Sequence, residues 1–249
     1  MLRFYPEGQT LRNFTLLISA TCFLSIFFFN EAIVAQAEKT EKSDRLVLDT
    51  AKSTVNFEFA FTLGKVRGEA RLNDFAFDKE LINTEPLAPI GKLSVDVASM
   101  KTGDDERDCH VKESLMLDYS QSKFPDEHIC TAEDEIRDDQ RGAIKFETVS
   151  FEISKIEIEP DWQALVAAGK PAKALASGAW NIRGAQKTDA IELVLSKTGE
   201  SPSKLTAVGA TKMDFSDFGI IVKEANLLLF KIRVKSPITV SLKLLFSEI

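Results

Sequence analysis

The sequence contains only two histidines, His110 and His128, among its 249 residues. It also contains no Gly-x-Ser-x-Gly nucleophile elbow and no glycine-rich loop of the kind that holds phosphate groups. The segment Asp217-Phe218-Gly219 has the letters of a kinase motif, but neither the glycine-rich loop nor the catalytic loop of a kinase accompanies it. We therefore expect a turn there, with Phe218 packed inward, and we expect the protein not to be an enzyme.

Positive charge is in short supply. The chain carries 31 lysines and arginines against 38 aspartates and glutamates, which gives a formal net charge of −7. An acidic chain without a basic stripe is a poor partner for nucleic acid or for an anionic membrane surface. We expect no nucleic-acid partner, whereas an uncharged lipid is compatible with this charge.

The N-terminus has the order of regions typical of a secretory signal peptide. Arg3 and Arg12 precede an uncharged apolar run over residues 14–29, and Ala35-Gln36-Ala37 then offers a cleavage site between small residues. The alternative is an uncleaved anchor, but the run is shorter than the roughly 20 residues that a spanning helix needs. We expect residues 1–37 to be a signal peptide, charged residues 38–45 to be a flexible leader, and the protein to be periplasmic.

Cysteine is also scarce, and only Cys109 and Cys130 remain after removal of this segment. In an oxidising compartment, two cysteines separated by a short loop indicate a candidate disulfide. Two unlinked thiols are the second interpretation, and a zinc site with the neighbouring His110 and His128 is the third. The spacing matches no recognised zinc motif, so we expect no metal.

The mature chain alternates between apolar and polar residues in many short segments. Val55, Phe57, Phe59 and Phe61 alternate with other residues, which is typical of a strand with one buried face. A return strand follows over 66–72, and Leu93, Val95 and Val97 alternate again. Further strand-like segments lie at 126–133, 143–159, 177–183, 189–197, 203–215 and 227–246. Interruptions predict a short helix over 107–117, in the 104–120 connection, and an inserted helical segment near 161–176.

Many short strands with turn residues between them predict an all-β sandwich or barrel. Phenylalanine occurs 18 times against two tyrosines and two tryptophans, so the apolar faces carry few polar groups. Such a lining suits either a filled core or a cavity for an apolar ligand, and composition does not separate the two.

Several blocks of the sequence resemble the YceI-like family. The most distinctive are residues 95–103 (VDVASMKTG), 106–110 (ERDCH) and 123–125 (KFP). Upstream, residues 49–57 (DTAKSTVNF) and 65–68 (KVRG) are similar to the family's opening hairpin, and downstream residues 180–184 (WNIRG) and 213–220 (MDFSDFGI) are similar to later motifs. The matches follow the family's order from about residue 46 to the C-terminus.

The resemblance implies an eight-stranded antiparallel lipocalin-like β-barrel over residues 46–249. It also implies binding of a polyisoprenoid or related long-chain lipid in the periplasm of Gram-negative bacteria. Three positions depart from the family's pattern: Phe61 replaces a common histidine, Phe215 a common arginine, and Cys109 a common glutamate. Because two polar groups are missing, a polar or charged lipid head group is less expected than an apolar tail.

These observations together predict a site for an isoprenoid quinone, polyisoprenoid or fatty-acid-like lipid, with no other cofactor and with transient contact to a membrane or membrane protein. The residues expected to line it are Val55, Phe57, Phe59, Phe61, Val95, Val97, Trp180, Ile182 and Phe218. Arg107, Asp108 and His110 are expected at the rim of the barrel. For Arg107 and Asp108 we favour an ion pair or cap that holds the loop and helix over a contact at the barrel mouth. The rival functions are an enzyme of lipid or redox metabolism that uses the Cys/His cluster, and a stress-related or structural protein with a solid barrel.

The cleavage site generates a first prediction. The natural protein should begin near Glu38 and be found in the periplasm, because the small residues at 35–37 follow the apolar run. N-terminal sequencing of the protein from its source checks this. Recovery of intact Met1 in the membrane fraction would contradict it.

Overall fold

Antiparallel strands make up most of the computed structural model, which describes residues 44–131, 135–198, 204–222, 225–227 and 230–248. The expected signal peptide and nearly all of the expected leader lie outside the described residues. The strands are β1 (Arg45–Leu48), β2 (Thr54–Phe61), β3 (Gly64–Ala70), β4 (Ala76–Asp78), β5 (Gly91–Asp96), β6 (Thr148–Ile158), β7 (Ala172–Ile182), β8 (Ala185–Lys197), β9 (Lys204–Met213), β10 (Ala225–Leu227), β11 (Phe230–Ile232) and β12 (Val234–Glu248). The helices are α2 (Asp105–Met116) and α3 (Trp162–Ala167), with 3₁₀ turns η1 (Lys79–Leu81), η2 (Val97–Ser99), η3 (Asp138–Ala143) and η4 (Phe215–Phe218).

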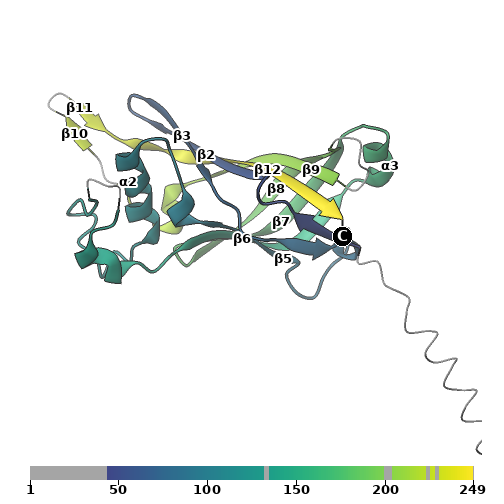
Figure 1. The fold of residues 1–249 in the computed structure, drawn as a ribbon, viewed down its shortest axis with the longest axis horizontal. Coiled ribbons are helices and arrows are strands. Elements are labelled where there is room, and N and C mark those ends of the chain that lie inside the picture. Colours follow the sequence, from purple (N-terminus) through teal and green to yellow (C-terminus); the bar gives the residue numbers. More distant parts are fainter. Residues whose placement is uncertain (1–43, 132–134, 199–203, 223–224, 228–229, 249) are drawn as a thin grey trace, which may run out of the picture. The chain divides into compact units, whose positions relative to one another are not determined.

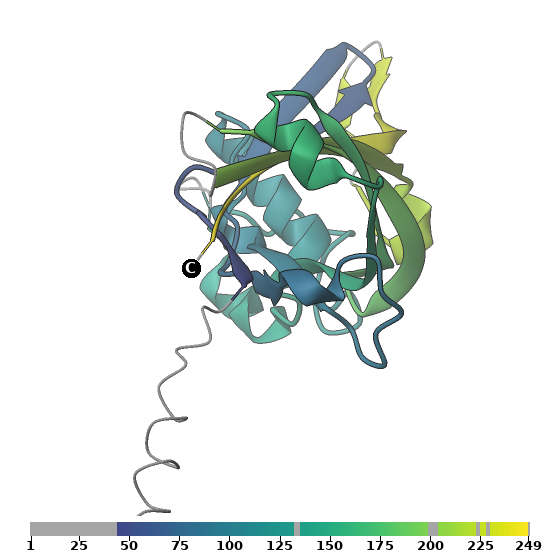
Figure 2. The ribbon, with the colours of Figure 1, turned by 90° about the vertical axis from the view of Figure 1, so that its right-hand side faces the viewer.

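Eight of these strands form a curled antiparallel sheet in the order β3-β2-β12-β9-β8-β7-β6-β5 (Figures 1 and 2). The two edge strands meet through isolated antiparallel bridges, Leu72 with Val95 and Glu69 with Lys101. At the second bridge the two residues exchange backbone hydrogen bonds of 2.8 and 2.9 Å. The expected eight-stranded antiparallel barrel is therefore confirmed.

The inner face of the barrel follows from the period-2 pattern of its strands. In β2 and β12, Phe57 lies opposite Val240, and Val55 lies opposite Leu242. Because neighbouring residues of a strand point to opposite faces, one row of apolar side chains from each strand points inward. Short strands β1 and β4 pair with each other, and β1 also pairs with the C-terminal part of β12.

One end of the barrel is filled with packed side chains. The rings of Phe75 and Phe77 pack edge-on against Phe246, with centroids 6.3 and 5.8 Å away. Leu46 and Leu48 of β1 are buried in the same apolar core. This packing accounts for the two short strands, because they bring additional apolar side chains to the core that the barrel strands share.

Helix α2 lies at the other end (Figure 1), and it agrees with the helix expected over 107–117. Asp104 is its N-cap, with a side chain that accepts a hydrogen bond of 3.0 Å from the Arg107 backbone N–H. Three acidic residues in the first turn match the positive end of the helix dipole. No helix in the described ranges is long and apolar enough to cross a membrane.

The inserted helical segment expected near 161–176 is only partly correct. Helix α3 ends at Ala167, and strand β7 begins at Ala172. Ala172, Ala174 and Ala176 alternate with more exposed residues and are buried. Alanine favours helices, but here the burial of every second residue in the sheet outweighs that propensity.

The expected strand at 126–133 is wrong for the residues described there. Cys130 forms one isolated bridge with Ile136. The backbone N–H of Ile129 donates to the Glu113 side chain at 2.8 Å instead of to a neighbouring strand. The segment is therefore attached to helix α2 by side-chain contacts.

A close approach between β6 and β7 generates a second prediction. A Cβ atom on Gly178 would lie 2.2 Å from the Glu152 carbonyl oxygen, where the register of the two strands shifts. Gly178→Ala should lower the free energy of unfolding by about 1–3 kcal/mol, because backbone must move to admit the methyl group. The matched control is Gly142→Ala, where the added Cβ meets no atom within 4 Å. Chemical denaturation of both variants checks this, and equal stabilities would contradict it.

Candidate functional site

A cavity of about 410 Å³ lies inside the barrel, bounded by its strands, by η4 and by helix α2. The strands contribute mostly aliphatic and aromatic side chains. Polar side chains lie chiefly on α2, which contributes Glu106, Arg107, His110, Glu113 and Ser114. The cavity therefore has an apolar wall and one polar end.

Most of the expected lining residues border this cavity. They are Val55, Phe57, Phe59, Phe61, Val95, Trp180, Ile182 and Phe218. The rings of Phe57 and Phe59 are nearly parallel, with centroids 6.4 Å apart, and Phe215 meets Phe59 edge-on at 6.4 Å. Phe215 therefore makes this part of the wall aromatic.

Val97 does not border the cavity. Strand β5 ends at Asp96, whose side chain accepts a hydrogen bond of 2.9 Å from the Ala98 backbone and starts the turn η2. Val97 belongs to that turn and is fully buried in the core. The alternation Leu93, Val95, Val97 continues in the sequence past the point where the strand ends.

Two groups of lining residues were missed by sequence reasoning. Ile238, Val240 and Leu242 of β12 alternate visibly within the expected strand at 227–246. In α2, Val111, Ser114 and Leu115 were missed. Together with the expected rim residue Arg107 they have the spacing i, i+4, i+7, i+8, which places them on one face of a helix. Both patterns are present in the sequence, but neither indicates that the β12 row and the α2 face border the same cavity.

The expected rim residues separate into two groups. Arg107 and His110 border the cavity, whereas Asp108 does not. Asp108 is almost fully buried and accepts hydrogen bonds from the backbone and hydroxyl of Thr102, at 2.5 and 2.6 Å. Burial opposes its ionisation, but the hydrogen bonds from Thr102 and Lys101 lower the pKa of Asp108 below its ordinary value. Asp108 thus attaches α2 to the preceding loop, as the favoured interpretation held.

The C-terminal end of α2 is held by the turn between β7 and β8. The Arg183 guanidinium donates hydrogen bonds to the backbone carbonyls of Ser114 and Leu117, at 3.1 and 2.7 Å. It also stacks on the Tyr119 ring, 3.6 Å from its centroid. A cation at this position interacts favourably with the carbonyl end of the helix.

A disulfide joins Cys109 of α2 to Cys130, with 6.0 Å between their Cα atoms. Of the three interpretations of these cysteines, the structure contains the disulfide. Cys109 is fully buried in a second apolar cluster with Leu117, Phe124 and Ile129. The bond therefore attaches residues 124–130 to the side of helix α2.

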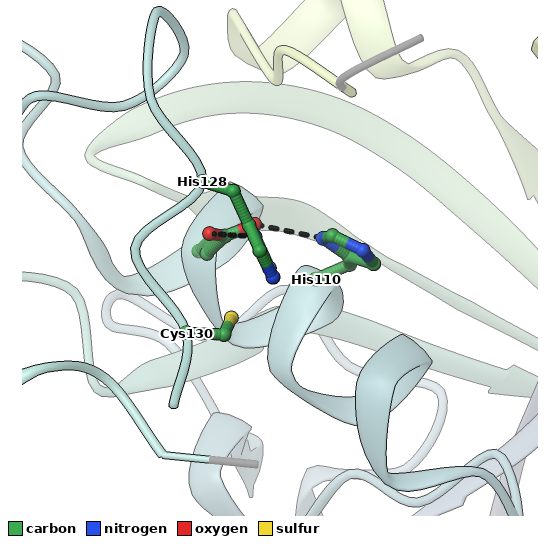
Figure 3. Close-up of side chains that lie close together, drawn as sticks. His110, His128 and Cys130 are labelled. Carbon is green, nitrogen blue, oxygen red and sulfur yellow. Dashed lines mark hydrogen bonds and ion pairs between the residues drawn. The ribbon is translucent and has the colours of Figure 1, made fainter. Parts of the chain in front are cut away.

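Glu113 is hydrogen-bonded to both histidines, which Figure 3 labels together with Cys130. Its carboxylate is fully buried and is hydrogen-bonded to Nδ1 of His110 at 2.8 Å and to Nδ1 of His128 at 2.9 Å. Burial opposes ionisation, but the hydrogen bonds from His110 and the Ile129 backbone lower the pKa of Glu113. A buried anion thus lies at the polar end of the cavity.

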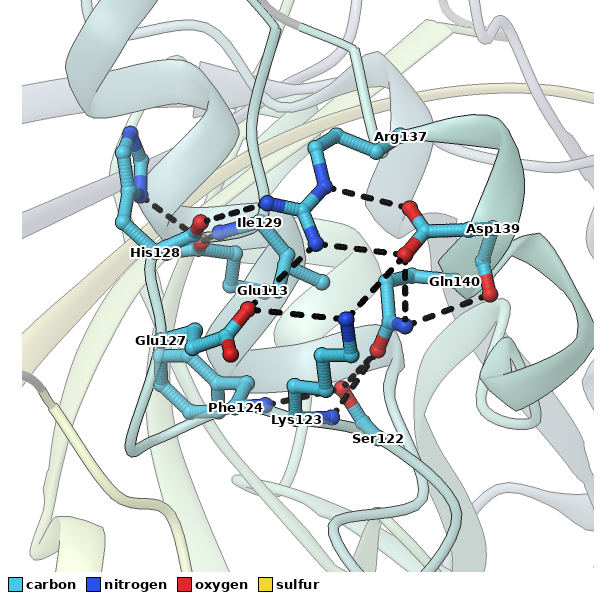
Figure 4. A network of polar contacts seen from close by, with 10 residues as sticks. All are labelled: Glu113, Ser122, Lys123, Phe124, Glu127, His128, Ile129, Arg137, Asp139 and Gln140. Carbon is cyan, nitrogen blue, oxygen red and sulfur yellow. Dashed lines mark hydrogen bonds and ion pairs between the residues drawn. The ribbon is translucent and has the colours of Figure 1, made fainter.

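The loop that carries His128 is fixed by its own polar network (Figure 4). Arg137 donates to both carboxylate oxygens of Asp139, at 3.1 and 3.2 Å, and to the His128 carbonyl at 3.3 Å. Gln140 accepts a hydrogen bond of 2.9 Å from the Lys123 backbone. The network positions His128 against Glu113.

Among the described residues, one group of side chains around Glu113 could hold a metal ion. One ligand atom from each of His110, Glu113, His128 and Cys130 lies within 4.8 Å of the others. While Cys130 is bonded to Cys109, its sulfur is not a thiolate, and thiolate is the form that binds metals. The expectation of no metal stays a prediction.

Comparison with solved structures shows the same fold in a polyisoprenoid-binding domain from Saccharophagus degradans. That domain is 13% identical, with a TM-score of 0.53 over 82% of this chain and 98% of the other. Burkholderia cenocepacia BcnA is 16% identical, with a TM-score of 0.46 over 80% of this chain and 98% of its own. A Campylobacter jejuni YCEI protein is 14% identical, with a TM-score of 0.36 over 71% of this chain and 79% of its own.

None of the curated proteins compared with the chain matches it. A model of the YceI-like domain, in contrast, matches residues 46–246, which include the whole cavity wall and all of the barrel strands except the last two residues of β12. The chain therefore belongs to the YceI-like domain family.

Proposed function

We propose that this protein binds and carries a long-chain apolar lipid inside its barrel, in the periplasm. The ligand class is a polyisoprenoid, an isoprenoid quinone or a fatty-acid-like chain. The observation that carries the proposal is the apolar cavity of about 410 Å³, a volume within the range of small-molecule sites, roughly 300–1,000 Å³. Binding gains about 25 cal/mol for each Å² of apolar surface removed from water, before association costs.

The distribution of polarity in the cavity supports one orientation of the lipid. The tail would lie along the rows of β2 and β12, because Phe57, Phe59 and Val240 offer no hydrogen-bonding groups. The other end would lie near α2, where Arg107 and His110 border the cavity. A lipid bound in this way needs no covalent step.

The periplasmic part of the proposal rests on two features. The N-terminal residues have the pattern of a signal peptide, and disulfides persist in oxidising compartments. Release or uptake of a lipid would require transient contact with a membrane or a membrane protein.

The cavity also favours a carrier over a solid barrel. Phe75, Phe77 and Phe246 fill one end of the barrel, whereas the side chains of the described residues leave a cavity beside Phe57 and Phe59. A solid barrel would have no such space. Cys109 and Cys130 are joined in a disulfide, so neither offers a free thiolate for an enzyme that uses the Cys/His cluster.

Filling the cavity should abolish lipid binding. Val240→Trp places a large ring on the cavity wall, so a copurified lipid should be lost from the folded protein. The matched control is Val194→Trp on β8, because Val194 is 48% exposed and does not border the cavity. Native mass spectrometry after mild extraction checks both variants. A wild-type protein without lipid, or equal lipid in both variants, would contradict the proposal.

The loss of unfolding free energy when a phenylalanine of the cavity wall is replaced by alanine tests for the same cavity in the lipid-free protein. Phe59 is half-buried on the cavity wall, whereas Phe151 is 1% exposed in the core. Phe151→Ala should cost about 3–5 kcal/mol through lost contacts and a void. Phe59→Ala should cost clearly less, because its ring has packing on fewer sides, and lipid retention should change instead. Denaturant midpoints of the lipid-free proteins check this, and equal losses would mean that Phe59 lies in a filled core.

A further inference from the structure

We propose that reduction of the Cys109–Cys130 disulfide creates a zinc site at the polar end of the cavity, formed by His110, Glu113, His128 and Cys130. The proposal does not depend on the identity of the lipid. It rests on the position, type and charge of these four side chains.

The four ligands already lie close together before any metal binds. One ligand atom of each residue lies within 4.8 Å of the others, and the rings of His110 and His128 are 4.6 Å apart between centroids. Zinc binds nitrogen at about 2.0–2.1 Å and sulfur at about 2.3 Å, so neighbouring atoms of a tetrahedral site are about 3.3–3.6 Å apart. The longest of these distances would have to shorten by about 1 Å, and the 2.8 and 2.9 Å distances from Glu113 to the two imidazoles would have to lengthen by about 0.5 Å. Figure 3 shows the sulfur of Cys130 pointing toward the same space as the two imidazoles.

The ligand types select zinc over harder cations. Two imidazoles, a carboxylate and a thiolate suit Zn²⁺, whereas Mg²⁺ and Ca²⁺ prefer oxygen ligands. The charges also balance, because the Glu113 carboxylate and the Cys130 thiolate together neutralise Zn²⁺. Neutrality matters here because Glu113 is fully buried, and an uncompensated buried charge is costly.

The surroundings hold the ligands in place in the way that metal sites require. The Ile129 backbone donates to Glu113 at 2.8 Å, and Arg137 donates to the His128 carbonyl at 3.3 Å. His110 and Glu113 lie three residues apart on α2, which places them on one face of the helix. Such outer contacts orient metal ligands.

The disulfide decides whether the fourth ligand is present. A dithiol reductant transfers two electrons and two protons to the bond, which gives two thiols, and the reductant itself becomes a disulfide. The Cys130 thiol then loses its proton on binding Zn²⁺. Cys109 is not among the four ligands. Zinc would thus replace the covalent link between α2 and the 128–130 segment, and this end of the cavity would stay attached in both redox states.

The test compares two variants that lack the disulfide equally. Cys109→Ser leaves Cys130 free to bind zinc, whereas Cys130→Ser removes the proposed ligand and leaves Cys109. Titration with zinc sulfate should show that Cys109→Ser binds Zn²⁺ about a hundredfold more tightly than either Cys130→Ser or the oxidised wild type. With Co²⁺ as the probe, Cys109→Ser should also show a thiolate-to-cobalt charge-transfer band.

Equal affinities of the two cysteine variants would overturn the proposal, as would a cobalt complex without the charge-transfer band. In the Cys109→Ser background, His128→Ala should abolish most of the increase in Zn²⁺ affinity. Retention of the full Zn²⁺ affinity in this double variant would also overturn the proposal. If the variants do not fold, wild-type protein reduced with a phosphine gives the same comparison against its oxidised form. Absence of tighter Zn²⁺ binding after reduction, with the circular dichroism spectrum unchanged, would contradict the site.

Discussion

The antiparallel pairing of β12 with both β2 and β9 is the interaction on which the rest of the structure depends. The pairing joins the last strand of the chain to the first long one, so the sheet curls on itself and its apolar rows face one shared interior. The contacts between β3 and β5 then complete the barrel with few hydrogen bonds. The wall residues of β2 and β12 owe their inward direction to this register, because a slip by one residue would turn each row outward.

The two ends of the barrel are closed in different ways. At one end, Phe75, Phe77 and Phe246 fill the interior and contribute to stability. At the other end, helix α2 covers the space without filling it, because the helix is held from outside the cavity. Asp108, the Cys109 disulfide and Arg183 each attach it to a different neighbouring segment. A rigidly held helix allows an empty volume to persist beside it, and that volume is what the proposed lipid would occupy.

At the polar end of the cavity, Glu113 both holds a neighbouring segment in place and belongs to the proposed zinc site. Glu113 accepts a hydrogen bond from the Ile129 backbone and so attaches the 124–130 segment to α2. The same carboxylate lies against two imidazoles and next to a disulfide, which is where the proposed zinc site would form. The proposed dependence of that site on redox state rests on Cys109 and Cys130, which a disulfide joins.

The sequence by itself determined the features that depend on local pattern. Alternation at Val55, Phe57 and Phe59 predicted an inward row, an interruption of the alternation predicted helix α2, and the resemblance to a family predicted the barrel. Cys109 and Cys130 were recognised as a candidate pair, although two other interpretations stayed open.

Only the tertiary structure decided what depends on distant segments. The alternation through Val97 ends at a turn that Asp96 starts. Residues 126–131 of the expected strand at 126–133 form no strand, and the backbone N–H of Ile129 donates to the Glu113 side chain. The pairing of Glu113 with His128 likewise joins residues 15 positions apart. Whether the barrel is hollow depends on the summed volume of side chains from many strands and one helix. A period of two residues gives the direction of each side chain, but it does not give the space left between them.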